Sequence, residues 1–361
     1  MDFDLSADQA ALRDAACELL DDRCATAQVR AVAESDGQWD QALWARMVEQ
    51  GWLVTAVPEA DGGLGLGLVE LAVLLEQIGA HVAPVPFLPT VIAIEVARRA
   101  HATELLTALV DGGRTACLAW SPGTATLAVH DGRLTGRSDP VPFAPIADVA
   151  VVVAADRDAA GAPGVFLLDL DALGRPAAQP AMDLTRPLGW LEVDGVPVVR
   201  LGGEDLVAYL LDTAAAATCC EMLGGAQRAL DLAVEYAKDR VQFGRPIGSF
   251  QAVKHRCADM LVDVEGIRST AYWAAWSLAV DDADGSIAAS TAKTWAGDAS
   301  KRVMASALQV HGGIGFTWEH DLHLYLKRAQ LDQLAFGDAS WHRARLGGLL
   351  RTKVDAGMSV L

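Results

Sequence analysis

The chain has 361 residues, of which 52% are hydrophobic and 21% charged, and its formal net charge at pH 7 is −18. This length allows two or three packed units. The negative charge argues against a nucleic-acid partner, which selects a basic surface, but a few local arginines or backbone N–H groups are enough to hold an anionic small ligand.

Two features of the sequence argue against a targeting or membrane segment. The first ten residues are acidic and their apolar positions are interrupted by polar ones, which is not the pattern of a signal peptide. The longest stretch without charged side chains, 77–94, contains Pro84, Pro86 and Pro89 and would make a poor membrane helix. We therefore expect a cytoplasmic protein with no membrane insertion.

Residues 1–116 are patterned as helices, because apolar side chains recur with the helical period. The stretches that show or continue this period are 11–21, 39–49, 68–78, 92–97 and 104–110. Ser6 is placed to cap the first helix. The turn-rich stretch 57–63 separates the second from the third. We predict an N-terminal helical domain over 1–116.

The pattern changes at residue 117 and again at residue 204. Between them, short β-branched or apolar runs such as 149–153 and 165–168 are bounded by Gly, Pro and Asp, which predicts a β middle domain over 117–203. Long helical patterns then return at 205–240, 251–280, 287–310, 318–336 and 339–354. Facing helices of this length predict a C-terminal bundle over 204–361. The expected fold class is mostly α with a β barrel or sandwich in the middle and a four-helix bundle after it.

The six cysteines offer no metal or disulfide pattern. No two of them form a C-x-x-C pair, and Cys219 and Cys220 are adjacent. We expect buried apolar thiols and no metal site.

The stretch 240–255, RVQFGRPIGSFQAVKH, joins two of the long predicted helices through a Gly/Pro turn. It is polar and cationic, and Arg240 can form a bidentate contact with a phosphate. Alternatively, Arg240 complements the dipole at the end of its helix, ahead of a solvated loop. The spacing alone leaves both interpretations open.

A second stretch, QVHGGIGF at 309–316, ends another long predicted helix at glycines. Glycine allows the backbone to approach a flat or phosphorylated ligand closely. The alternative is an ordinary helix C-cap. Neither this cluster nor the glycines of 62–67 follows a buried strand with G-x-G-x-x-G spacing, so neither predicts a dinucleotide-binding loop.

Together these stretches resemble the acyl-CoA dehydrogenase family, whose flavin signature reads R-x-x-F-G-x-x-[IL]-x-x-[FH]-Q and, farther on, Q-x-x-G-G-x-G-[FY]. The stretch 52–63 is similar to the family's V-P-E-x-x-G-G turn, so the resemblance spans the chain. It implies FAD bound between two subunits, with the ring on the β domain of one and the diphosphate and adenosine on the helices of the other. The residues that it assigns to the diphosphate and adenosine end are Arg240, Gln242, Phe243, Gln251, Gln309, Gly312 and Gly313.

The catalytic base of such an enzyme is harder to find in this chain. Removing the α-proton of an acyl thioester requires a carboxylate beside it. In one branch of the family this Glu lies in a Y-E-G-T loop, where alignment places Phe336, and in another on the preceding long helix, near Ala214. Glu221 and Asp338 remain as candidates. Alternatively, Glu221 is a helix-surface or subunit-contact carboxylate, and Asp338 caps the helix that starts near Ala339.

The middle domain also departs from the family pattern. The usual [T/S]-E-P-x-x-G-S-D segment reads AWSPGTAT at 119–126, and the W-I-[ST] segment over the flavin ring reads SDPVPF at 138–143. Pro140 and Pro142 stand about where the family's Trp and Thr would be. Proline has neither an indole nor a hydroxyl, and its nitrogen carries no hydrogen to donate. The chain's own β domain therefore lacks the expected flavin-ring contacts.

A retained diphosphate site and a lost ring site suggest the non-catalytic subunit of an α2β2 acyl-CoA dehydrogenase, lending Arg240 and 309–313 to FAD on a homologous partner. The resemblance implies an acyl-CoA substrate, β-oxidation of fatty acids or steroid side chains, and an electron-transferring flavoprotein as acceptor. The stretch 318–325, WEHDLHLY, is similar to the bacterial branch with this organisation. Two alternatives stay open: a self-sufficient homotetramer with Glu221 or Asp338 as base, and a flavin-free binding or regulatory subunit.

Overall fold

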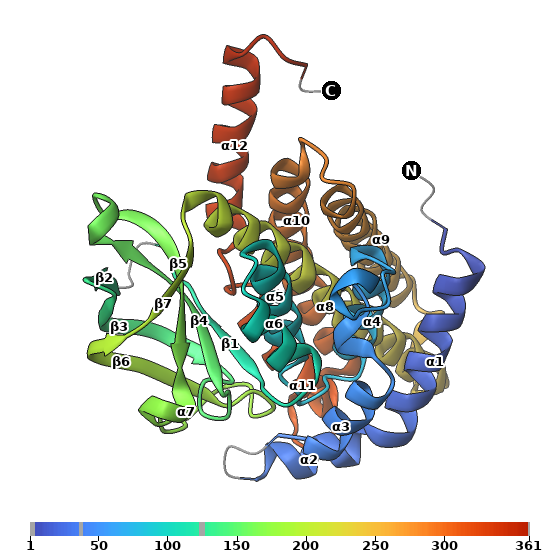
Figure 1. Ribbon diagram of the computed structural model, residues 1–361. Helices are drawn as coiled ribbons and strands as arrows, with labels where there is room; N and C mark the ends of the chain where they lie inside the picture. Colours follow the sequence, from blue (N-terminus) through green and yellow to red (C-terminus); the bar gives the residue numbers. More distant parts are fainter. Residues whose placement is uncertain (1–3, 36–38, 123–126, 360–361) are drawn as a thin grey trace. The chain divides into compact units, whose positions relative to one another are not determined.

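The computed structural model describes residues 4–35, 39–122 and 127–359 (Figure 1). The chain divides into two compact units. We call one the bundle unit (Met1–Ala27, Ala72–Ala83 and Ala215–Leu361) and the other the sheet unit (Gln28–Leu71 and Pro84–Ala214). The order of elements is the one expected from the sequence, with N-terminal helices, a β middle segment and C-terminal helices. The three domain boundaries given above stay a prediction.

The sheet unit contains, among the described residues, one seven-stranded sheet with the order β6-β3-β2-β4-β5-β7 and β1 paired to β4. Its strands are β1 (Ala116–Ala119), β2 (Ala128–His130), β3 (Arg133–Pro142), β4 (Val149–Asp156), β5 (Ala162–Asp169), β6 (Leu188–Pro197) and β7 (Val199–Gly202). The two runs predicted as strands form β4 and β5, which pair antiparallel from Val149 opposite Asp169 to Asp156 opposite Ala162. Phe166, Val152 and Leu191 pack in the core of the sheet.

The helices of the sheet unit are α2 (Thr26–Ala33), α3 (Gln41–Glu49), α5 (Phe87–Arg99), α6 (Thr103–Val110), the short α7 (Leu170–Leu173), and the 3-10 turns η1 (Trp52–Val54) and η2 (Glu59–Asp61). Among them, α3 and α6 follow the predicted stretches 39–49 and 104–110, whereas α2 and α7 were not predicted. The stretch predicted as 92–97 is the interior of the longer α5. Pro89 lies in the first turn of α5, where a missing N–H breaks no helical hydrogen bond.

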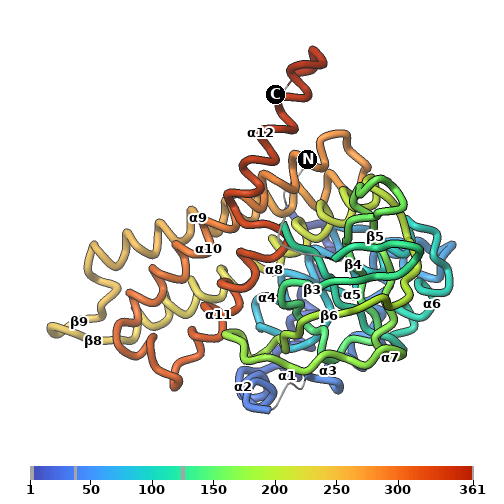
Figure 2. The backbone as a smooth tube through the Cα atoms, turned by 90° about the vertical axis from the view of Figure 1, so that its left-hand side faces the viewer, coloured from blue at the N-terminus to red at the C-terminus, as the bar shows by residue number. Residues whose placement is uncertain are grey.

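The bundle unit is built from long helices (Figure 2). They are α1 (Ala7–Arg23), most of α4 (Leu68–Ala80), most of α8 (Glu204–Asp239), α9 (Gln251–Ala279), α10 (Gly285–His311), α11 (Leu322–Asp332) and α12 (Ala339–Asp355). Ser6 caps α1 as predicted: its hydroxyl accepts the Gln9 N–H at 3.2 Å, and the Gln9 side chain accepts the Ser6 N–H at 2.9 Å. Four of the six cysteines are buried, while Cys17 and Cys257 are half-buried.

The helix predicted over 318–336 is wrong in its bounds. The 3-10 turn η5 (Gly312–Phe316) and an irregular link precede α11, which begins at Leu322 and ends at Asp332. Phe336 and Gly337 have φ of +55° and +97°, so the helix cannot continue through them. Apolar periodicity alone did not reveal this stop.

Helices α4 and α8 approach within backbone contact. A Cβ added to Gly79 of α4 would lie 1.9 Å from the Glu221 carbonyl oxygen, and one added to Gly224 of α8 would lie 1.8 Å from that of Glu76. Only glycine fits at either position. The two helices therefore cross in close contact at Glu221, and α8 is packed inside the bundle unit.

Helix α8 alone among the described helices is long and apolar enough to span a membrane by length and composition. Its most apolar window has a mean hydropathy of 1.4, and 89% of that window is buried inside the protein. The apolar sequence of α8 is therefore explained by protein packing.

Candidate functional site

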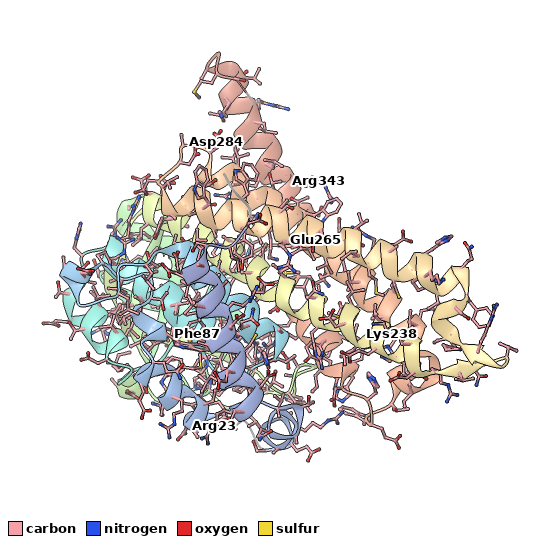
Figure 3. The ribbon with its side chains drawn as sticks, turned by 90° about the vertical axis from the view of Figure 1, so that its right-hand side faces the viewer. Arg23, Phe87, Lys238, Glu265, Asp284 and Arg343 are labelled. Carbon is pink, nitrogen blue, oxygen red and sulfur yellow. The ribbon has the colours of Figure 1, made fainter. Side chains whose placement is uncertain are left out.

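The predicted phosphate-binding connection folds as a tight hairpin between α8 and α9, here called the elbow (residues 240–251). Its strands are β8 (Val241–Gln242) and β9 (Arg245–Pro246), followed by the turn η4 (Ile247–Ser249). Phe243 and Gly244 both have positive φ, 53° and 78°, as a two-residue hairpin with the twist of a type I′ turn requires. Figure 2 shows the elbow at the far end of α8 and α9, beyond Lys238 in the last turn of α8 (Figure 3).

The elbow presents its predicted ligand-binding side chains to the surface. Arg240, Gln242 and Gln251 are exposed, and the Phe243 ring is 92% exposed. Within the described residues, the Arg240 guanidinium has no side-chain partner. The Arg240 backbone carbonyl accepts the Ile247 N–H at 2.8 Å and closes the hairpin, while the alternative role of its side chain at the end of the helix dipole stays open. An exposed cation on a rigid hairpin can bind a phosphate.

The second predicted segment ends α10. Gly312 is the C-cap residue with φ of +63°, so the predicted alternative of a helix C-cap is confirmed. This role is compatible with ligand binding, because a Cβ at Gly312 or Gly313 would meet nothing within 4 Å. The backbone there is open to a ligand, and the neighbouring Gln309 is exposed.

A ring contact brings these two segments to the same end of the bundle unit. The Tyr236 ring of α8 stacks on the His311 ring at the end of α10, with centroids 4.8 Å apart and planes inclined by 27°. Tyr236 lies one helical turn before Arg240, and His311 directly precedes Gly312. Sequence reasoning missed both residues. The position of an aromatic side chain one turn before the arginine was the available signal.

Glu221, the first candidate base, lies in a buried ion pair. Its Oε1 accepts a hydrogen bond from Arg328 Nη1 of α11 at 2.5 Å, and the two side chains are 0% and 3% exposed. The Glu221 carboxylate is the counter-charge of a buried guanidinium, and removing either partner of such a pair is strongly destabilising. This arrangement supports a structural role for Glu221 inside the bundle unit.

Asp338, the second candidate, is the N-cap of α12, because its Oδ1 accepts the Trp341 N–H at 2.8 Å. The alternative predicted for it is therefore confirmed. Phe336, two residues earlier, accepts a hydrogen bond from His342 Nε2 on its carbonyl at 2.9 Å. Hydrogen bonds from α12 therefore fix both Phe336 and Asp338 in the segment that aligns with the family's Glu-bearing loop.

A buried lysine, which sequence reasoning also missed, fixes the same segment. The Lys293 side chain of α10 is fully buried, and its ammonium donates to the carbonyls of Asp332 at 3.0 Å, Gln333 at 3.0 Å and Gly337 at 2.9 Å. The three N–H protons of the ammonium thus match the three carbonyl oxygens that accept them. Burial lowers the pKa of Lys293 to about 8, against the raising effect of nearby acidic groups that include Asp332. Lys293 therefore ties the end of α11 to the Phe336 turn.

The residues aligned with the flavin-ring contacts lie on paired strands of the sheet unit. Pro140 of β3 stands opposite Trp190 of β6, and Pro142 opposite Leu188. Pro140 is exposed and Pro142 half-buried, while Val141 between them is in the core. The two prolines give this face of β3 no N–H donor at either position. In the other predicted departure, 119–126, residues 123–126 lie outside the described part of the chain.

Comparisons with known proteins agree with the motifs and the fold. Models of the acyl-CoA dehydrogenase N-terminal and C-terminal domains match residues 6–105 and 202–348. The acyl-CoA dehydrogenase IpdE2 of Mycolicibacterium smegmatis is 36% identical over 90% of this chain and 93% of its own. The chain belongs to the acyl-CoA dehydrogenase family. This family is typically FAD-dependent and oxidises a CH–CH bond.

Two solved structures are similar to this acyl-CoA dehydrogenase family member over nearly its whole length. The steroid acyl-CoA dehydrogenase Tcur3481–Tcur3483 matches with a TM-score of 0.88 and 34% identity, covering 96% of this chain and 99% of the other. The ChsE4–ChsE5 complex of Mycobacterium tuberculosis matches with a TM-score of 0.88 and 32% identity, covering 97% and 99%. Relatives of this chain thus include complexes of two different subunits.

Proposed function

We propose that this chain is the non-catalytic subunit of a heteromeric α2β2 acyl-CoA dehydrogenase. It contributes the elbow and residues 309–313 to the diphosphate and adenosine end of FAD, whose ring lies on the β domain of a homologous partner subunit. The partner supplies the base that removes the α-proton of the acyl-CoA substrate. Family membership supports this role, and so does the difference between the elbow and β3 in this chain.

The observation that carries the proposal is the contrast between the elbow and β3. The elbow offers an exposed arginine, two exposed amides and an open glycine backbone, all of which fit an anionic nucleotide. The face of β3 offers Pro140 and Pro142 where ring contacts are needed, so the residues there do not fit an isoalloxazine. Such a chain fits one end of FAD.

When FAD is bound, it supplies the hydride acceptor of the dehydrogenation. The residues of this chain hold the cofactor. Arg240 would bind the diphosphate, Gln242 and Gln251 would contact the diphosphate and adenosine end, and Gly312 and Gly313 would let the backbone approach it. No proton transfer is assigned to this chain.

The relatives support the finer parts of the proposal. One similar structure, Tcur3481–Tcur3483, is a steroid acyl-CoA dehydrogenase, which supports a steroid or other bulky acyl-CoA as substrate class. A more distant relative is a subunit of a caffeyl-CoA reductase–Etf complex, 25% identical over 91% of this chain, which supports an electron-transferring flavoprotein as acceptor. Function in the cytoplasm and the three-domain division of the chain belong to the same proposal.

The two alternative functions have less support. A self-sufficient homotetramer needs a base, and Glu221 lies in a buried ion pair while Asp338 caps α12. A flavin-free subunit would leave the exposed Arg240 and the open backbone at Gly312 without a function.

Flavin stoichiometry tests the proposal directly. The chain is purified with its bound subunits through a tag, in its native host. We expect one FAD per two chains, and little or none when this chain is purified alone. One FAD per chain in an active homo-oligomer would refute the proposal.

Substitution at the elbow gives the matched test. Arg240→Ala should lower the affinity of the complex for FAD, because a charge-assisted contact to phosphate is lost. Arg351→Ala is the control, since Arg351 is exposed on α12 and has no partner among the described residues. Equal FAD affinity in both variants would favour the flavin-free alternative.

A further inference from the structure

Three aromatic rings in the bundle unit lie in consecutive contact, here called the ring stack: Tyr236, His311 and His320. The Tyr236 and His311 rings stack with centroids 4.8 Å apart and planes inclined by 27°, while the His311 and His320 rings are tilted by 59° with centroids 4.3 Å apart. His320 belongs to the WEHDLHLY stretch, for which the proposed function gives no role. The ring stack therefore joins α8, the end of α10 and the link that leads into α11.

Hydrogen bonds to the backbone fix both histidines in place. His311 is 3% exposed, and its Nδ1 donates to the Ala307 carbonyl at 2.8 Å, since a carbonyl can only accept. His320 Nδ1 accepts the N–H of Leu322, the first residue of α11, at 3.1 Å. Burial lowers the pKa of His311. The tautomer and orientation of each ring are thereby set by the main chain.

The ring stack connects the two segments assigned to the cofactor. Tyr236 is four residues before Arg240 on one rigid helix, and the N–H of Arg240 donates to the Tyr236 carbonyl at 2.9 Å. His311 is bonded to Gly312, and a Cβ at Gly315 would lie 3.0 Å from the His311 Cβ. Any shift of Tyr236 against His311 therefore moves the elbow against the glycine segment.

We propose that Tyr236 and His311 are positioning residues of the nucleotide site, and that His320 supports them. Their stacking sets the separation between Arg240 and the backbone at Gly312, and hence the affinity for the diphosphate of FAD. This inference rests on the proposed function. It adds that the site is assembled by a contact between two helix ends, neither of which binds a nucleotide alone.

The competing explanation is that the ring stack is ordinary core packing. Tyr272 provides the control, because it is a tyrosine of the same unit on α9 that is 8% exposed, and thus more buried than the half-buried Tyr236. Its hydroxyl donates to Glu76 Oε2 at 2.7 Å, far along α9 from the elbow. A variant of Tyr272 lowers the stability of the bundle unit and leaves the ring stack intact.

The test measures FAD affinity of the tagged complex by recovery of flavin fluorescence on dilution, together with the midpoint of thermal unfolding. Tyr236→Leu and His311→Leu should each weaken FAD binding about tenfold, in line with the loss of an aromatic pair. Tyr236→Phe should keep the wild-type affinity, because it keeps the ring and the Tyr236 hydroxyl has no partner among the described residues. Tyr272→Leu should lower the unfolding midpoint with no loss of affinity.

The outcomes separate this inference from the proposed function. If Arg240→Ala weakens FAD binding but Tyr236→Leu and His311→Leu do not, the ring stack has no positioning role. If Tyr272→Leu weakens binding as much as they do, the effect is general destabilisation and the inference fails. If Arg240→Ala itself has no effect, the proposed function fails first. Should both leucine variants fail to assemble, His320→Leu decides: an unchanged affinity overturns the inference, and a loss of about threefold supports it.

Discussion

Lys293 allows a quantitative test, because the structure buries a whole ammonium group in the bundle unit. The substitution is Lys293→Met, which keeps the length of the side chain and removes its charge and its three hydrogen bonds to the carbonyls of Asp332, Gln333 and Gly337. The charged form of Lys293 is disfavoured by burial, which lowers its pKa from 10.5 to about 8.

The sign of the pH dependence follows from proton counting. Between these two pKa values the unfolded chain binds more protons than the folded one, so the free energy of unfolding rises with pH. The full difference of about 2.5 pKa units corresponds to about 3 kcal/mol, of which about 2 kcal/mol falls between about pH 7.5 and about pH 9.5. This contribution is absent in Lys293→Met, which has no group to titrate at that position.

Urea unfolding of both proteins, followed by tryptophan fluorescence at several pH values, provides the measurement. The quantity of interest is the unfolding free energy of the wild type minus that of Lys293→Met, because other side chains that titrate in this range cancel. We expect this difference to increase by about 2 kcal/mol from about pH 7.5 to about pH 9.5. A difference that stays constant with pH, or decreases, would refute the assignment of a buried ammonium to Lys293.

Two further predictions concern the α8 core. Glu221→Gln should lower the free energy of unfolding by about 3 kcal/mol, because Arg328 then keeps its buried charge without a carboxylate partner. As a control, Glu49→Gln in an exposed ion pair should change the free energy of unfolding by less than about 1 kcal/mol. Equal effects of the two variants in urea unfolding would contradict the buried pair. Gly79→Ala should lower the free energy of unfolding by about 3 kcal/mol or more, because its Cβ would overlap the Glu221 carbonyl. Gly347→Ala should raise the free energy of unfolding by about 0.5–1 kcal/mol, because a Cβ at this position of α12 meets open space. Thermal unfolding of both glycine variants checks the contrast.

Local sequence patterns predicted several of the helices and strands. The runs 149–153 and 165–168 became β4 and β5, and Ser6 caps α1 with its capping box. In each case the decisive signal is local: a short apolar run bounded by turn residues, or a side chain that bonds the backbone three residues on. The positive φ of Gly244 and Gly312 is likewise a local demand that the glycine positions signalled.

Contacts between distant residues could not be predicted in this way. Lysine is almost never fully buried, so a sequence reader places Lys293 on the surface, and its acceptors are 39 to 44 residues away. Glu221 and Arg328 are 107 residues apart, and each looks like a surface charge in its own helix. The early stop of α11 has the same origin, because Lys293 binds the carbonyls at the helix end.

Under the proposed function, the two parts of the flavin site place different physical demands on a chain, so that one part can be lost while the other stays. Holding a diphosphate needs an exposed cation and an open backbone at helix ends, as at Arg240 and Gly312, and neither feature is part of the core. Contacting the ring needs donors on the outer face of β3. Pro140 is exposed there, while the neighbouring Val141 keeps its place in the sheet core at 3% exposure. Changes at the outer positions therefore leave the packing of the sheet intact. Under the proposed function, a subunit whose partner holds the ring is free to lose these donors without losing its fold.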